Sequence, residues 1–192
     1  MKQQRRPKDW KNYDDFAAGI ATNRLPQSAG LYGQSLALTL ANGREIGLSF
    51  AAGPVGRSEN GRTHLAPADL VMVAPDVFFL DTMPDPARPV AETLILSRAS
   101  GRVLSVQARV RAETEADGAP RVAQDWQAGV IGGMMLNGPE PAPTRDLIER
   151  MAHYAYSPSY TYEHIYLSSE RYAWQCLNGV QRGHGDVDDL AL

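Results

Sequence analysis

The sequence predicts an all-β protein: an antiparallel barrel followed by a short, tyrosine-rich C-terminal β extension. Apolar residues alternate with polar ones along the first two thirds of the chain, which is typical of strands with one buried face. Turn-forming residues interrupt these runs about every ten residues. No helical pattern long enough for a parallel crossover lies between residues 33 and 128. Tight turns between short strands favour an up-and-down antiparallel barrel, with a sandwich as the alternative.

The alternating runs at residues 36–40 and 46–50 predict the first hairpin. A three-residue loop, Ala41-Asn42-Gly43, places Leu38 opposite Ile46 and keeps the buried face continuous, whereas a two-residue turn would split it. The glycine of this loop is therefore expected in a left-handed conformation.

The same turn chemistry recurs at Ala99-Ser100-Gly101. A second three-residue loop is predicted there, with Leu94 opposite Val106 and with its glycine again at positive φ. Further strands are expected at residues 70–73, 77–80 and 121–127.

Glycine and proline gather between residues 129 and 143, which predicts a linker. The linker separates an N-terminal barrel, residues 1–138, from a partial C-terminal module, residues 144–192. Short helices are expected at residues 9–18 and 144–150, strands at 151–156, 160–167 and 170–177, and a loop and tail at 181–192.

Composition excludes several classes of protein. The net charge of −3 offers no global basic field for nucleic acid, and the single cysteine, Cys176, excludes an intrachain disulfide. No stretch of about 18 apolar residues is available to span a membrane, and the basic N-terminus lacks the apolar segment of a signal peptide. We therefore expect a cytoplasmic chain. We also expect no metal or cofactor, because no tight ligand spacing relates the four histidines, which are His64, His153, His164 and His184.

The C-terminal hairpin carries the candidate functional residues. A loop at Ser168-Ser169-Glu170 pairs Tyr166 with Tyr172 and His164 with Trp174, so that one face of the hairpin is aromatic. An aromatic wall with polar tips suits a planar, partly polar ligand. The alternative is that these tyrosines are simply good strand residues in structural cross-strand pairs. Outside the hairpin, Trp126 either lines the barrel interior or packs in the core.

Two stretches resemble the molybdenum cofactor biosynthesis protein F (MoaF) family. One is Asp-Phe-Ala-Ala-Gly-Ile-Ala-Thr-Asn-Arg-Leu-Pro at residues 15–26, and the other combines Tyr-Glu-His-Ile-Tyr-Leu at 162–167 with residues 171–175 and Gly-His-Gly-Asp-Val-Asp at 183–188. The resemblance implies calycin-like, lipocalin-type β-barrels, and the family name implies cofactor synthesis. Family members continue for several strands beyond the second stretch. The final strands are therefore expected to be missing, which leaves an edge for the first barrel or another copy to cover.

The leading hypothesis is a MoaF-like barrel that binds a small planar or aromatic molecule. The expected ligand-contacting residues are Tyr160, Tyr166, Trp174 and Trp126. One alternative is a cofactor-free isomerase, decarboxylase or lyase, in which His164 is the acid or base while Tyr162 and Tyr172 orient the substrate. Another is a structural or assembly partner. The expected partner is a small molecule, and not nucleic acid or a membrane. A homo-oligomer is one of the open alternatives, in which a second copy covers the C-terminal strands.

Overall fold

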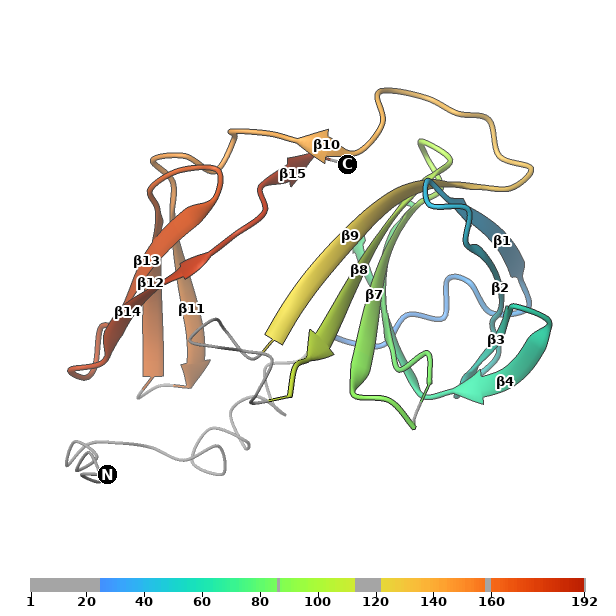
Figure 1. Cartoon of the computed structure of the whole chain (residues 1–192), viewed down its shortest axis with the longest axis horizontal. Helices are drawn as coiled ribbons and strands as arrows, with labels where there is room; N and C mark the ends of the chain where they lie inside the picture. Colours follow the sequence, from blue (N-terminus) through green and yellow to red (C-terminus); the bar gives the residue numbers. More distant parts are fainter. Residues whose placement is uncertain (1–24, 86, 113–121, 158–159, 192) are drawn as a thin grey trace. The chain divides into compact units, whose positions relative to one another are not determined.

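In the part of the chain that the computed structural model describes, every regular element is a β-strand. The structure describes residues 25–85, 87–112, 122–157 and 160–191, so the helix expected at 9–18 lies outside the described residues. Residues 26–142 form one compact unit, and residues 143–191 belong to a second (Figure 1). None of the described residues forms a helix long and apolar enough to cross a bilayer. The predicted all-β class is confirmed.

The first unit is a nine-stranded antiparallel sheet that curls into a nearly closed barrel. In spatial order the strands run β4-β3-β2-β1-β9-β8-β7-β6-β5, so that β1 to β3 face β7 and β8 across the interior (Figure 1). The strands are β1 (Ser35–Leu40), β2 (Glu45–Ser49), β3 (Val55–Glu59), β4 (Arg62–Ala66), β5 (Ala68–Ala74), β6 (Val77–Thr82), β7 (Val90–Ser97), β8 (Arg102–Val110) and β9 (Val122–Ile131).

The segment that precedes β1 helps to complete this barrel. The Ser28 N–H donates a hydrogen bond of 2.7 Å to the carbonyl of Leu70 in β5, and the Gly33 N–H donates one of 2.9 Å to the carbonyl of Phe50, beyond β2. Leu31, between these two anchors, is fully buried in the core. The segment therefore runs from β5, at one edge of the sheet, to the end of β2 on the other side of the barrel.

The core follows the period-two pattern of the sequence. Alternate residues of β1 are buried, and the leucines of β6 and β7 meet them inside the barrel. Burial of this apolar surface is the main force that curls the sheet. The core includes Leu36, Leu38, Leu40, Ile46, Leu48, Leu80, Leu94, Leu96, Val103 and Ile131.

The first predicted register is confirmed and the second is wrong. Leu38 lies opposite Ile46, with Gly43 at a φ of 83°. Leu94, however, lies opposite Ser105 and not opposite Val106. The connection from β7 to β8 has four residues, 98–101, which sets Val103 and Ser105 opposite the buried leucines of β7. The interior face of β8 therefore begins with an apolar residue and continues with a polar one, and alternation of apolar residues does not reveal it. The expected positive φ at Gly101 is nevertheless present, at 70°.

The C-terminal part of the chain forms a four-stranded antiparallel sheet, β11-β12-β13-β14, and a two-stranded pair, β10-β15. Their bounds are β10 (Ala142–Pro143), β11 (Met151–Ser157), β12 (Tyr160–Tyr166), β13 (Arg171–Cys176), β14 (Arg182–Asp186) and β15 (Leu190–Ala191). The three strands predicted after the linker are confirmed.

Two C-terminal expectations are wrong. Residues 144–150 form a turn instead of a helix, because the Asp189 carboxylate accepts a hydrogen bond from the Leu147 N–H at 2.9 Å and holds the chain beside β15. Residues 182–186 form β14 instead of a loop, because they pair with β13 and extend the sheet by one strand.

We predict that Gly43→Ala destabilises the barrel by about 1 kcal/mol, because a side chain at positive φ is strained. Open space surrounds Gly43, so strain is the whole effect there. Gly101→Ala should cost more, because its new Cβ would lie 2.8 Å from the carbonyl oxygen of Met135. Chemical denaturation of the two variants measures the difference, and equal stabilities would contradict the steric argument.

Candidate functional site

A cluster of buried charges crosses the interior of the barrel. The charged residues continue the buried faces of their strands: Arg57 follows Val55 in β3, and Glu92 precedes Leu94 in β7. Arg57 is 1% exposed and Glu92 is fully buried. The alternation that places leucines in the core therefore also places opposite charges there.

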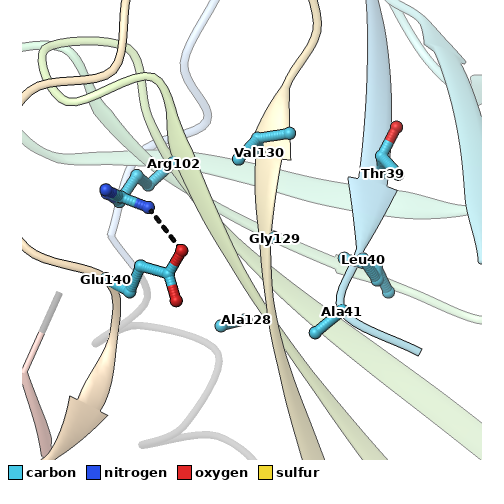
Figure 2. Close-up of a pocket in the computed structure, with 8 residues that line it drawn as sticks. All are labelled: Thr39, Leu40, Ala41, Arg102, Ala128, Gly129, Val130 and Glu140. Carbon is cyan, nitrogen blue, oxygen red and sulfur yellow. Dashed lines mark ion pairs between the residues drawn. The ribbon is translucent and has the colours of Figure 1, made fainter. Parts of the chain in front are cut away.

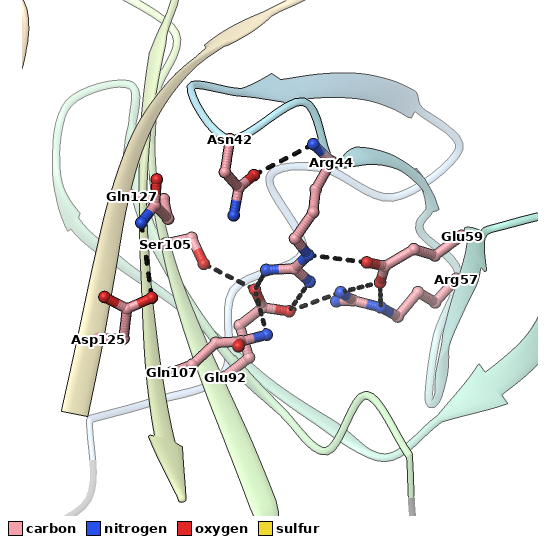
Figure 3. Close-up of polar contacts among 9 residues, drawn as sticks. All are labelled: Asn42, Arg44, Arg57, Glu59, Glu92, Ser105, Gln107, Asp125 and Gln127. Carbon is pink, nitrogen blue, oxygen red and sulfur yellow. Dashed lines mark hydrogen bonds and ion pairs between the residues drawn. The ribbon is translucent and has the colours of Figure 1, made fainter. Parts of the chain in front are cut away.

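Glu92 is the centre of this cluster (Figure 3). Its carboxylate accepts hydrogen bonds from Arg57 Nη2 at 2.5 Å, from Arg44 Nη1 at 3.0 Å and from Ser105 Oγ at 2.6 Å. Arg44 and Arg57 come from the β2–β3 side of the barrel, whereas Glu92 and Ser105 come from β7 and β8. The carboxylate thus joins two walls that share no backbone ladder.

Glu59 completes the ion pairing. It accepts from Arg44 Nε at 2.8 Å and from Arg57 Nη2 at 2.7 Å, so two arginines and two glutamates form one neutral network. Arg44 reaches the interior because the three-residue loop sets it opposite the buried Leu40, whose N–H donates to the Arg44 carbonyl. We call Arg44, Arg57, Glu59 and Glu92 the barrel ion cluster.

The cluster keeps its carboxylates ionised. Burial alone would raise the pKa of Glu92, but the charge of Arg57 and the hydrogen bonds from Arg44 and Ser105 lower it below the ordinary value. Burial likewise opposes ionisation of Glu59, and the hydrogen bonds from Arg44 and Arg57 lower its pKa. Both groups are therefore charged at neutral pH.

An open cavity of about 840 Å³ adjoins the cluster. Its volume lies within the range that small-molecule sites use, and Arg44 and Glu59 belong both to its wall and to the ion cluster. The cavity is lined by Arg44, Glu59, Asn60, Arg62, His64, Leu65, Pro84, Asp85, Arg88, Val90 and Gln107.

A smaller hollow lies where β1 and β9 approach each other (Figure 2). Arg102 and Glu140 form an ion pair of 3.5 Å beside it, and Gly129 allows the close approach because a Cβ there would lie 2.5 Å from the Thr39 carbonyl. Its volume of about 140 Å³ is below that of a typical ligand site.

The predicted aromatic hairpin has the expected register. Tyr166 lies opposite Tyr172, and His164 lies opposite Trp174. The rings contact one another along the sheet: His164 stacks on Tyr172 with centroids 4.8 Å apart, and Tyr162 lies 5.6 Å from Trp174. Tyr160 is the first residue of β12, and the aromatic side chains of β12 and β13 are all half-buried.

Two glycines of β14 provide room for these rings. A Cβ on Gly183 would lie 2.8 Å from the Trp174 ring, and one on Gly185 would lie 2.6 Å from the Tyr172 ring. Aromatic rings that cover strand glycines shield the backbone and fix strand register. This packing accounts for the Gly-His-Gly pattern as a strand feature.

Some tyrosine hydroxyl groups on the aromatic face already form hydrogen bonds within the protein. The Tyr162 hydroxyl donates to Gln181 Oε1 at 2.7 Å, and the Tyr154 and Tyr166 hydroxyls lie 3.1 Å apart. The hydrogen bond with Tyr154, together with burial, raises the pKa of Tyr166 to about 12. Burial raises the pKa of Tyr162 and lowers that of His164, which is therefore neutral at pH 7.

The other residues singled out in the sequence lie elsewhere. Trp126 pairs with Val106, on the face opposite to the one that Ser105 and Gln127 share, so the register places it away from the ion cluster. Cys176 is buried at the end of β13. Among the residues that the structure describes, no group of three or more His, Cys, Asp or Glu side chains is arranged to hold a metal ion.

Sequence reasoning missed the barrel ion cluster. A usable signal was present, because Arg57, Glu59 and Glu92 occupy positions in phase with buried apolar residues. A charged residue on a buried face requires a partner of opposite charge. Searching for such in-phase charges on strands that face each other would have identified the cluster.

Family models match both parts of the chain. The model described as the MoaF N-terminal domain matches residues 8–112, and the model described as the MoaF C-terminal domain matches residues 141–192. A curated relative, Protein MoaF from Klebsiella aerogenes, is 55% identical over 51 residues, which are 27% of this chain and 20% of the relative. That match spans about a fifth of the relative's length.

We predict that Glu92→Gln destabilises the barrel by about 3–5 kcal/mol, because it removes the fully buried carboxylate of the network and leaves Arg44 and Arg57 with Glu59 as their one carboxylate within the cluster. Asp85→Asn is the matched control. Asp85 pairs with Arg88 at 3.7 Å with both side chains at least half exposed, so its loss should cost less than about 1 kcal/mol. Urea denaturation at neutral pH measures both changes.

The difference in stability between the wild type and Glu92→Gln should depend on pH. The pKa of Glu92 is lower in the folded chain than in the unfolded chain, so its stabilising contribution is complete above the unfolded pKa of about 4.3. The contribution is lost as the pH falls through the lower, folded pKa. The stability gap between the wild type and Glu92→Gln should therefore narrow in acid, and a constant gap would contradict the assignment.

We also predict that Tyr154→Phe lowers the pKa of Tyr166 from about 12 towards the ordinary value, because it removes the hydroxyl partner. Tyr156→Phe is the control, since Tyr156 contacts the Tyr162 ring. Carbon-13 NMR of labelled tyrosine measures ionisation at about pH 11, where only the Tyr154→Phe variant should show an ionised Tyr166. An unchanged titration would exclude this hydrogen bond as the cause.

Proposed function

This chain belongs to the MoaF family, and we propose that its N-terminal barrel binds a small polar molecule in the cavity beside the barrel ion cluster. The observation that carries the proposal is the combination of a cavity of about 840 Å³ with charged side chains that are already fixed in place. Small-molecule sites are concave and combine a volume of this size with a few oriented polar groups.

Preorganisation supports this function. The guanidinium of Arg44 is held by Glu59 on one side and by Glu92 on the other, so it does not have to be ordered when a ligand enters. A group that is fixed before binding saves the conformational entropy that a mobile side chain would lose. The cavity wall can therefore select a ligand by geometry as well as by charge.

A planar ligand on the aromatic face of β11–β14 is the second candidate. The specific observation in its favour is the half-buried stack of His164 on Tyr172. A neutral imidazole beside phenol rings suits a flat, partly polar molecule, and it is the group that an acid–base reaction at this face would use. The experiment below separates this candidate from the barrel cavity.

We predict that a small-molecule screen will produce shifts at the barrel cavity. The nitrogen-15 labelled full chain is titrated with a fragment set that contains carboxylates, phosphates, amides, sugars and aromatic heterocycles. The amide resonances expected to move are those of Asn60, His64, Leu65 and Gln107, which line the cavity. Movement at His164, Tyr172 and Trp174 instead would favour the second candidate.

Two tryptophan variants test the location. Val90→Trp places a large ring in the cavity from its wall, whereas Val122→Trp adds the same ring at an exposed end of β9. Binding should be lost in Val90→Trp and retained in Val122→Trp. If no fragment moves the cavity resonances of the wild-type chain, the proposal is wrong.

A further inference from the structure

We propose that the barrel cavity recognises an anionic oxygen, carried by a carboxylate or a phosphate group, through the paired side chains of Arg57 and His64. This inference rests on the proposed function and adds the chemical class of the ligand. It comes from the hydrogen-bonding capacity that the barrel ion cluster leaves unused.

Two buried nitrogen atoms at this wall lack hydrogen-bond partners. Within the described ranges, Arg57 Nη1 and His64 Nε2 are both inaccessible to solvent and have no partner. A buried polar atom without a partner is costly, so native structures usually satisfy it with protein, water or ligand. An arginine N–H is a permanent donor, and the group that satisfies it must be an acceptor.

The strand register brings these two side chains together. Arg57 of β3 lies directly opposite His64 of β4, so their side chains project from the same face, with Cβ atoms about 5 Å apart. His64 lines the cavity, and Arg57 lies behind the wall with 1% exposure. The pair therefore places a residue of the cavity wall next to a buried arginine directly behind it.

The ligand has to supply the acceptors, because the carboxylates of the cluster are occupied. Both oxygens of Glu92 accept from arginine, and one of them also accepts from Ser105. The two oxygens of Glu59 accept from Arg44 and Arg57. A cationic or donor-rich ligand would thus compete with existing ion pairs. An anion instead accepts from Arg57 Nη1, which has no partner, and from His64 Nε2 in the tautomer that carries the proton on this nitrogen.

The charge at the mouth of the cavity agrees with this class. Arg62 and Arg88 are exposed residues of the lining, Asp85 pairs with Arg88, and Glu59 is engaged in the ion cluster, so Arg62 is the cation left in excess among these four. Arginines around a cleft raise the local concentration of anions and speed their association. The cavity thus combines exposed positive charge in its lining with a buried, unpartnered arginine donor behind its wall.

Titration of the full chain with benzoate and benzamide tests the inference. The two probes have nearly the same size and shape, but only benzoate is an anion. Benzoate should move the resonances of Asn60, Leu65 and Gln107 and should bind at least about tenfold more tightly, because hydrogen bonds to a charged group are stronger. Inorganic phosphate is the third probe, and tighter binding of phosphate or of benzoate supports the inference and identifies which anion the site prefers.

The variant His64→Phe keeps a ring of similar size and removes Nε2 without touching the ion cluster. It should weaken benzoate several-fold and leave benzamide unchanged, whereas His153→Phe, in the other unit, should change neither. Because His64 is only half-buried, this variant avoids the instability expected if Arg57 were replaced.

The outcomes are distinguishable. Equal binding of benzoate and benzamide at the cavity overturns the anion assignment and leaves the proposed function in place. No shift from benzoate or phosphate also overturns it, and buried water then satisfies the two nitrogens. Benzoate binding that survives His64→Phe unchanged overturns the assigned pair. Only failure of every probe and of the whole fragment set removes the proposed function as well.

Discussion

The fully buried carboxylate of Glu92 is the constraint on which the arrangement of the barrel interior depends. An isolated charge at such a depth is strongly unfavourable, so a folded barrel must bring a cation to it. Arg57 and Arg44 meet this requirement from the opposite wall. Backbone ladders determine the register of neighbouring strands only. The ion cluster therefore acts together with the apolar core to fix how β2 and β3 stand against β7 and β8 across the interior.

The position of the cavity follows from the same charges. Leucines interdigitate and fill one part of the interior, together with Leu31 from the segment before β1. Guanidinium and carboxylate groups are held by directional hydrogen bonds and cannot close-pack in the same way. The interior thus divides into a packed apolar part and a charged part that opens into a cavity of about 840 Å³. Packing and site geometry are two consequences of one alternating pattern.

Strand register could be predicted from the sequence where the buried face and the turn residues indicate the same pairing. The hairpin at Gly43 and the aromatic pairing of Tyr166 with Tyr172 depend on local alternation, and both registers were predictable. The β7–β8 register was not, because Leu104 is buried on the outer face and made the wrong face of β8 look apolar. The ion cluster was also missed, since it joins residues as far apart as Arg44 and Glu92 and no local rule pairs them.

The charges of the ion cluster balance, but its hydrogen-bond donors and acceptors do not. A guanidinium carries five N–H donors, and a carboxylate accepts about four hydrogen bonds, so two arginines and two glutamates hold about ten donors against about eight acceptor positions. Ser105 uses part of the acceptor capacity as well. A donor surplus is therefore built into the composition of the cluster, and Arg57 Nη1 is where the structure leaves it. That surplus lies beside a cavity wall. The interaction that holds the barrel together therefore also supplies the unmatched donor on which the proposed recognition of an anion rests.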